Sequence, residues 1–156
     1  MIILVILEFY MITIKKFDAL TTIELYQILR LRAEVFVVEQ GQAYLDLDNY
    51  DYESIHFFIQ ENDQIVSYLR ILPFGYYENS HVNGRVVSNK EVRGKGNMRL
   101  LLNAAIDYLR TRYSGELLTI GAQEYLLDYY ASFGLKVYGE RYYEDNLPHK
   151  KMKMIL

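Results

Sequence analysis

The spacing of apolar and polar residues predicts alternating strands and helices. From Met11 to Phe17 the two kinds of residue alternate, which is typical of a strand with one buried face. Thr21-Thr22-Ile23-Glu24 then has the form of a capping box, so a helix begins here. Residues three and four positions apart make up its predicted buried face: Leu25, Ile28, Leu29, Arg32, Val35 and Phe36. Arg32 on this face is either a buried charge paired with a carboxylate or a residue that reaches a site.

The middle of the chain predicts an acidic loop and three strands. Residues 42–51 are polar and acidic, and a loop of this length in a compact domain is usually functional or mobile. Residues 54–60 and 64–73 are rich in β-branched and aromatic residues and flank a Glu61-Asn62-Asp63 turn, which indicates a hairpin. Residues 81–88 predict a further strand.

The C-terminal part of the chain predicts two helices and three strands. Apolar residues recur at helical spacing from Met98 to Leu109 and again from Leu126 to Phe133, where Gly134 favours a left-handed helix cap. Strands are predicted at residues 117–122, 135–138 and 151–156. This order of elements indicates an α/β or α+β fold, with helices on both faces of a sheet.

The segment from Val86 to Met98 is a candidate anion site, because an extended run leads through Gly94 and Gly96 into a helix. The first N–H groups of a helix have no intrahelical partners, and the positive end of the helix dipole adds to them, so phosphate suits this position. The segment fits neither the Walker A pattern nor the dinucleotide pattern G-x-G-x-x-G. It does match R-x-x-G-x-G/A, the coenzyme A pyrophosphate loop of GNAT acetyltransferases, at Arg93 and Gly96 but not at Met98. An ordinary glycine turn at the start of a helix is the alternative.

Composition limits the classes of protein that remain. The 156 residues, 51% hydrophobic and 24% charged, suit one globular domain. A net charge of −3 argues against a general nucleic-acid binder. Cysteine is absent, which excludes disulfides and a thiol nucleophile. Three histidines without ligand spacing predict no structural metal.

The N-terminus is apolar up to Leu7 but lacks the basic region and cleavage site of a signal peptide, and Glu8 interrupts it well short of a membrane span. We therefore expect no membrane anchor and a cytoplasmic protein. Because Met11 opens the alternating segment, residues 1–10 are either an N-terminal extension or an added strand, and residues 11–156 form a single domain.

Residues 11–156 resemble a GNAT N-acetyltransferase of the ElaA-type subgroup. The blocks that carry the resemblance follow one another in the family's order: Leu31–Gln40, Gly84–Val86, Arg93–Gly94, Gly121–Gln123, Tyr130–Gly134 and Tyr143–His149. Met98 departs from the family pattern, and so does Leu135, where phenylalanine is more usual. The resemblance implies a mixed, mostly antiparallel GNAT sheet flanked by helices.

The resemblance also implies acetyl-CoA as the acyl donor. Its predicted binding residues are Val86, Val87, Ser88, Arg93, Gly94, Lys95, Gly96, Asn97, Met98, Gln123 and Tyr130. The backbone N–H of Val87 is predicted to hold the thioester carbonyl oxygen. Tyr130 matches the family's tyrosine that protonates the leaving sulfur, with Tyr129 as the fallback and simple packing as the alternative.

The resemblance implies a primary amine of a small molecule or peptide as the acceptor, and the absence of cysteine favours direct attack on the thioester without an acyl-enzyme. An amine must lose a proton on transfer, and Glu39 is the first candidate base, His149 the second and His56 the third. Pairing of Glu39 with Arg32 or Arg85 is the alternative for that residue. Asp46 and Asp48 are predicted to attract a cationic acceptor, unless their loop is only a solvated lid.

Glu39, Asp46, Asp48 and His149 are thus the predicted acceptor-binding residues. Two further readings stay open: a non-catalytic acyl-CoA binder or sensor, which Met98 favours, and an acyl-homoserine-lactone synthase, which the absence of tryptophan disfavours. A homodimer is among the oligomeric states that the sequence leaves open.

Overall fold

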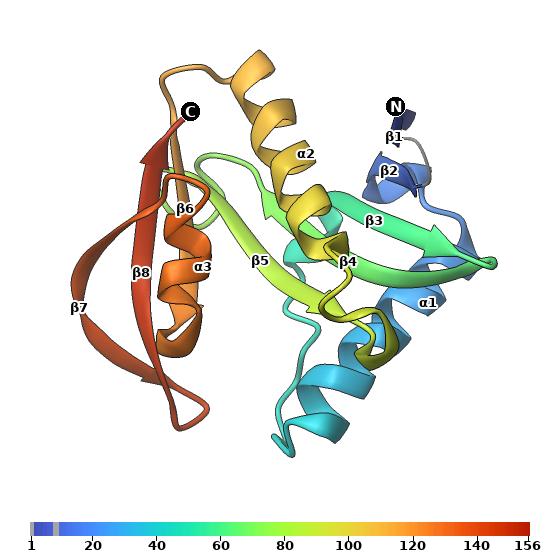
Figure 1. Ribbon diagram of the computed structural model, residues 1–156, viewed down its shortest axis with the longest axis horizontal. Helices are drawn as coiled ribbons and strands as arrows, with labels where there is room; N and C mark the ends of the chain where they lie inside the picture. Colours follow the sequence, from blue (N-terminus) through green and yellow to red (C-terminus); the bar gives the residue numbers. More distant parts are fainter. Residues whose placement is uncertain (1, 8–9) are drawn as a thin grey trace.

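The computed structural model describes residues 2–7 and 10–156 and contains one eight-stranded sheet (Figure 1). Its strands are β1 (Ile2–Leu7), β2 (Tyr10–Lys16), β3 (Ile55–Glu61), β4 (Gln64–Leu72), β5 (His81–Ser88), β6 (Leu117–Gln123), β7 (Lys136–Glu144) and β8 (Leu147–Ile155). The α-helices are α1 (Thr22–Arg32), α2 (Asn97–Arg112) and α3 (Leu127–Ala131). A π-helix continues α1 over Ala33–Glu39, and 3₁₀ turns occupy Phe17–Ala19, Tyr50–Tyr52, Lys90–Val92 and Glu124–Leu126. No helix in these described residues is both long and apolar enough to cross a membrane.

The strand order of the sheet is β1-β2-β3-β4-β5-β6-β8-β7. Neighbouring strands run antiparallel except β5 and β6, which run parallel. This arrangement confirms the predicted mixed, mostly antiparallel sheet. β1 extends the sheet by pairing with β2, while residues 1, 8 and 9 of the predicted N-terminal segment lie outside the described residues.

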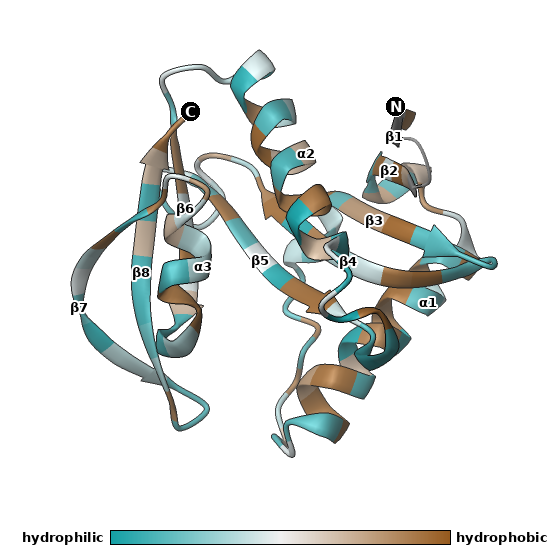
Figure 2. Ribbon diagram, in the orientation of Figure 1, coloured by the Kyte–Doolittle hydropathy of each residue, from teal (hydrophilic) through white to brown (hydrophobic). Residues whose placement is uncertain are grey.

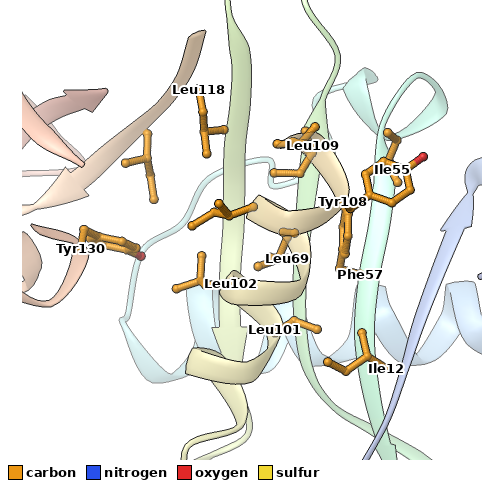
Figure 3. Packing of buried hydrophobic residues seen from close by; sticks show 14 of the residues in the cluster. Ile12, Ile55, Phe57, Leu69, Leu101, Leu102, Tyr108, Leu109, Leu118 and Tyr130 are labelled. Atoms are coloured by element: carbon orange, nitrogen blue, oxygen red, sulfur yellow. The ribbon is translucent and has the colours of Figure 1, made fainter. Parts of the chain in front are cut away.

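Two apolar clusters hold the helices on opposite faces of the sheet. Phe57 and Phe58 are neighbours in β3 but belong to different clusters, because successive side chains of a strand point to opposite faces. Leu101 and Leu109 of α2 pack with Phe57 in the larger cluster (Figure 3). Ile28 of α1 packs with Phe58 in the smaller cluster. Figure 2 shows the corresponding apolar residues along β3, β4 and β5.

The start of α1 is confirmed, but its continuation differs from the prediction. The Thr21 hydroxyl accepts the Glu24 N–H at 3.1 Å and the Glu24 carboxylate accepts the Thr21 N–H at 2.8 Å, which completes the capping box. Leu31 is buried, whereas Leu25 of the predicted face is only partly buried. Beyond Arg32 the backbone widens into a π-helix, so Glu39 lies at a different angle around the helix axis from that of a regular α-helix.

The C-terminal hairpin is longer than the sequence pattern predicts. β7 and β8 meet at Asp145 and Asn146, whose φ angles of +48° and +61° suit a two-residue hairpin turn. Most residues of β7 are exposed, so the strand has no alternating apolar pattern to reveal it. Gly134 has a φ of +97°, which confirms the left-handed position after α3.

Candidate active site

The two parallel strands at the centre of the sheet separate part of the way along their length. β5 and β6 pair only over His81–Asn83 and Leu118–Ile120, although β5 continues to Ser88 and β6 to Gln123 (Figure 1). Beyond this point β5 stays paired with β4, and β6 stays paired with β8. The divergence opens a cleft of about 530 Å³, lined by both strands, by the 42–50 loop, by α3 and by the β7–β8 hairpin.

The register of β5 decides which backbone groups face this cleft. The Asn89 N–H donates to the Val66 carbonyl at 2.8 Å, and Val87 lies opposite Tyr68 two residues earlier in the same ladder. Since N–H groups alternate sides along a strand, the Val87 N–H points toward β4 and that of Ser88 points away from it. The Val87 N–H is therefore turned away from the opening, which corrects the prediction for Val87, whereas Val86, at the bulge of β5, lines the cleft.

The glycine loop has the geometry that an anion site requires. Gly94 and Gly96 have φ angles of +78° and +89°, and a Cβ built on either glycine would meet no atom within 4 Å. Gly96 is the residue before α2 and has no side chain to cap the first turn of this 16-residue helix. Its first N–H groups are therefore free to bind a phosphate, and the loop leaves space for one.

Asn97 and Met98 anchor the start of α2. Asn97 is buried, and its Nδ2 donates to the Glu61 carboxylate at 2.9 Å. Met98 is partly buried, with its side chain packed against the larger apolar cluster. The departure of Met98 from the family pattern is thus accommodated by packing in the core. Lys95 is exposed on the loop.

Arg93 and Glu39 form an ion pair with each other, which changes both expectations. The Arg93 guanidinium donates to the two Glu39 oxygens at 2.5 and 2.9 Å and to the Ser88 carbonyl at 3.1 Å. This hydrogen bonding lowers the pKa of Glu39. Glu39 is also exposed and does not line the cleft, so the structure corrects its role as the first candidate base. The Arg93 side chain thus links the glycine loop to the π-helix.

Tyr130 is the tyrosine of α3 that lines the cleft. It is only 4% exposed, and Figure 3 shows its side chain among those of the larger apolar cluster. Burial and the neighbouring Tyr129 and Tyr125 raise the pKa of Tyr130, so its phenol stays protonated at neutral pH. Tyr129 does not line the cleft, and its ring contacts that of Phe133 edge to face, with 5.2 Å between ring centroids.

His149 lies across the opening from Val86. The last parallel pair of β5 and β6 joins Asn83 and Ile120, and Val86 and Gln123 each follow three residues later on their strands. Gln123 in turn pairs with His149 of β8. His149 Nδ1 must donate to the Leu147 carbonyl, 2.8 Å away, because a carbonyl only accepts. The neutral ring therefore has Nε2 as its acceptor nitrogen, and the residue lines the cleft.

Asp46 and Asp48 belong to a network of three carboxylates and three arginines that holds the 42–52 loop on the sheet. The Asp46 oxygens accept from Arg32 and Arg85, each at 2.7 Å. Asp48 accepts from Arg70 at 2.5 and 2.8 Å and from Arg85 at 3.1 Å. Burial would raise the pKa of Asp48, but Arg70 and Arg85 lower it to about 2.

This network corrects the expectation that both aspartates attract a cationic acceptor. Asp46 is 5% exposed and does not line the cleft, and Asp48 lines it with both oxygens already hydrogen-bonded. Arg32 is the buried, paired charge that the sequence allowed, with Asp51 as its second partner at 2.7 Å. The carboxylates serve to fix the loop that forms one wall of the cleft.

His56, the third candidate base, is part of the same wall and does not reach the cleft. It is 1% exposed, and its ring nitrogens lie 2.8 Å from the Tyr68 hydroxyl and 2.9 Å from the Asp51 carbonyl. Burial lowers the pKa of His56 to about 4, despite the opposing effect of Asp51. The structure therefore replaces a catalytic role for His56 with a structural one.

We expect this histidine to make the fold sensitive to acid. Between pH 6.5 and about pH 4 the unfolded chain binds a proton at His56 and the folded chain does not, so the free energy of unfolding falls as the pH falls through this range. The loss is about 2 kcal/mol between pH 7 and pH 5. Urea unfolding at both pH values measures it, and His56→Gln should lose most of the dependence. An unchanged dependence in that variant would assign the effect to other groups.

The sequence did not identify several residues that line the cleft. Tyr142 stacks on His149 with 5.5 Å between ring centroids, and its hydroxyl occupies the space that a Cβ on Gly121 would need. Tyr44 and Arg70 come from the loop network. Nothing in the local pattern marks Tyr44 or Arg70, because register and loop placement bring them to the cleft. The Asp-Asn pair at the hairpin tip was the available signal for Tyr142.

Comparison with known proteins assigns the family. The family model described as acetyltransferase (GNAT) domain matches residues 28–156. The chain therefore belongs to the GNAT acetyltransferase family. Its relatives include ElaA from Escherichia coli, 34% identical over 132 residues that cover 83% of this chain and 86% of ElaA. A UPF0039 protein from Synechocystis is 37% identical over 140 residues, which cover 88% of this chain and 90% of that protein.

Solved structures agree with this assignment. The crystal structure of an acyl-CoA N-acyltransferase from Pseudomonas aeruginosa superposes with a TM-score of 0.88 at 35% identity, covering 92% of this chain and 98% of that chain. The crystal structure of Escherichia coli ElaA gives a TM-score of 0.87 at 32% identity with the same coverage. The GNAT acyl-CoA N-acyltransferase fold and the resemblance to the ElaA-type subgroup are thus confirmed.

Proposed function

We propose that this chain transfers the acetyl group of acetyl-CoA to a primary amine of a small molecule or peptide by direct attack. The observation that carries the proposal is the opening between β5 and β6, a cleft that Val86 of β5 and the buried Tyr130 both line, beside a strand that leads through the glycine loop to the start of α2. Dependence on acetyl-CoA is a property of the family to which the chain belongs.

The residues that would hold acetyl-CoA follow from the free backbone groups. The N–H groups at the start of α2, reached through Gly94 and Gly96, suit the pyrophosphate. The β5 edge from Val86 to Ser88 suits the pantetheine arm. Acetyl-CoA supplies an acetyl group activated as a thioester. The Val86 N–H would donate to the thioester carbonyl oxygen and stabilise the negative charge that develops there.

Two side chains would move the protons of the transfer. The amine nitrogen forms a bond to the carbonyl carbon as the carbon–sulfur bond breaks, so the amine must lose a proton and the sulfur must gain one. Tyr130, protonated at neutral pH, would give its proton to the departing thiolate. His149 Nε2 would accept the amine proton, directly or through water, and replaces Glu39 in this role.

Amine-dependent release of the CoA thiol tests the proposal. We expect the wild-type chain to release thiol from acetyl-CoA when primary amines are added and to release little without them. Acetyl-CoA binding without thiol release across a broad amine panel would favour the acyl-CoA sensor instead. The packing of Met98 in the core removes the sequence feature that favoured the sensor.

A further inference from the structure

The acceptor half of the cleft is rich in aromatic side chains. Tyrosines from three separate segments line it: Tyr44 and Tyr50 from the loop, Tyr77 from the segment before β5, and Tyr142 and Tyr143 from β7. Tyr50 and Tyr77 touch edge to face at 5.8 Å between ring centroids. Tyr77 and Tyr143 are 61% and 67% exposed, so their rings remain available at the mouth. Aromatic faces attract cations, and ammonium groups in particular.

The charges that line the cleft leave an excess of negative charge. The three arginine and lysine side chains that line it all form ion pairs within the chain: Arg70 and Arg85 with Asp48, and Lys151 with Glu78. Glu144 and Asp145, at the hydrophilic tip of the β7–β8 hairpin (Figure 2), form no ion pair with any of residues 2–7 and 10–156. The tip and the loop face the same cleft, because Glu144, Asp145 and Tyr44 all line it.

A buried hydrogen-bond acceptor also lacks a partner in this cleft. Asn83 belongs to the last parallel pair of β5 and β6, lines the cleft at its closed end and is only 5% exposed. Its Oδ1 has no hydrogen-bond partner among the described residues. Leaving a buried carbonyl oxygen unpaired costs free energy, so the site favours a ligand that brings N–H donors.

The register gives the distance between the reacting end of the cleft and the free carboxylates. Tyr142 pairs with His149, and Glu144 follows two residues later along β7. Two strand residues span about 7 Å. This distance suits a short aliphatic diamine, with one nitrogen beside His149 and the other at the hairpin tip.

We infer that the acceptor is a diamine or a related amine with a second cationic group, in which one amine reacts and the other is held by Glu144, Asp145 and the neighbouring tyrosine rings. This inference rests on the proposed acetyl transfer. It assigns the binding of a cationic acceptor to the hairpin tip. Asp46 and Asp48, which the sequence suggested for this role, are neutralised by arginines. It also excludes amino acids as good acceptors, since every lining arginine and lysine is already paired with a carboxylate.

Three amines of equal chain length test the inference: putrescine, butylamine and γ-aminobutyrate, which end in a second amine, a methyl group and a carboxylate. We expect kcat/KM for putrescine to exceed that for butylamine about tenfold, from one exposed ion-pair contact and one cation–π contact. γ-Aminobutyrate should be the poorest acceptor. In the double variant Glu144→Gln, Asp145→Asn the putrescine-to-butylamine ratio should fall toward one. Asparagine tolerates the positive φ of position 145, so the turn is kept.

Glu140→Gln is the matched control, because Glu140 is an exposed carboxylate on the same strand outside the cleft. It should keep the wild-type ratio. Putrescine binding to the CoA-loaded chain, measured by calorimetry, separates the two proposals. Turnover with the same ratio in wild type and double variant overturns the inference alone. Putrescine binding that the double variant loses, without turnover of any amine, supports the cation site and contradicts the acetyl transfer.

Discussion

Tyr130→Phe is expected to lower the rate of thiol release about a hundredfold, since a positioned general acid typically contributes at least that factor. The phenylalanine ring fills the same buried space at the cleft, so acetyl-CoA binding should stay within about twofold of wild type. Steady-state kinetics with the best amine, together with a binding isotherm for acetyl-CoA, measure both quantities.

Tyr129→Phe is the control for this substitution. Tyr129 is adjacent in sequence but packs against Phe133 and Arg99 and does not line the cleft. It should keep nearly full activity. If Tyr129→Phe loses activity and Tyr130→Phe keeps it, the proton donor has been assigned to the wrong tyrosine.

Arg32→Met should lower the free energy of unfolding by about 3–5 kcal/mol, the usual cost of removing one partner from a buried ion pair. Arg32 is fully buried and donates to both Asp46 and Asp51. Methionine nearly fills the space but leaves these carboxylates with one fewer cation in a low-dielectric environment. Urea unfolding at pH 7 gives the difference.

Arg30→Met provides the comparison two residues away. Arg30 is exposed and pairs with Glu34 one helical turn later, an interaction that contributes about 0.3–0.5 kcal/mol. Equal losses in the two variants would show that the buried network does not hold the fold. A larger loss in Arg32→Met should also raise KM for the amine, because the network fixes the loop that carries Tyr44 and Tyr50.

The fold was predictable because its signals are local. The capping box at Thr21 and Glu24, the turn at Asn62 and Asp63 and the left-handed Gly134 depend on residues close in sequence, and each is present in the structure. The glycine loop is a local signal as well. Its φ angles at Gly94 and Gly96 follow from the residue type that the sequence shows.

The site was only partly predictable because charges choose partners across the fold. Glu39 pairs with Arg93, 54 residues away, and not with Arg32 or Arg85 as the sequence alternatives had it. The direction of the Val87 N–H depends on the register of β5 against β4, and a shift of one residue would reverse it. Composition and spacing contain neither piece of information.

The acceptor side shows the same limit. Asp46 and Asp48 are acidic in sequence but neutralised in the structure, whereas Glu144 and Asp145 form no ion pair among the described residues. His149 was the second candidate base from the sequence. It becomes the first because its pairing with Gln123 places it across the opening from Val86. Sequence predicted the residue types of the site more reliably than their roles.

Mass spectrometry of the amine after incubation with the chain and acetyl-CoA tests the central claim most directly. We predict an N-acetylated product whose amount equals the thiol released and which does not form when the chain or acetyl-CoA is omitted. Retention of acetyl-CoA by the chain with no acetylated amine, across diamines, monoamines and peptide N-termini, would contradict amine acetylation in this cleft.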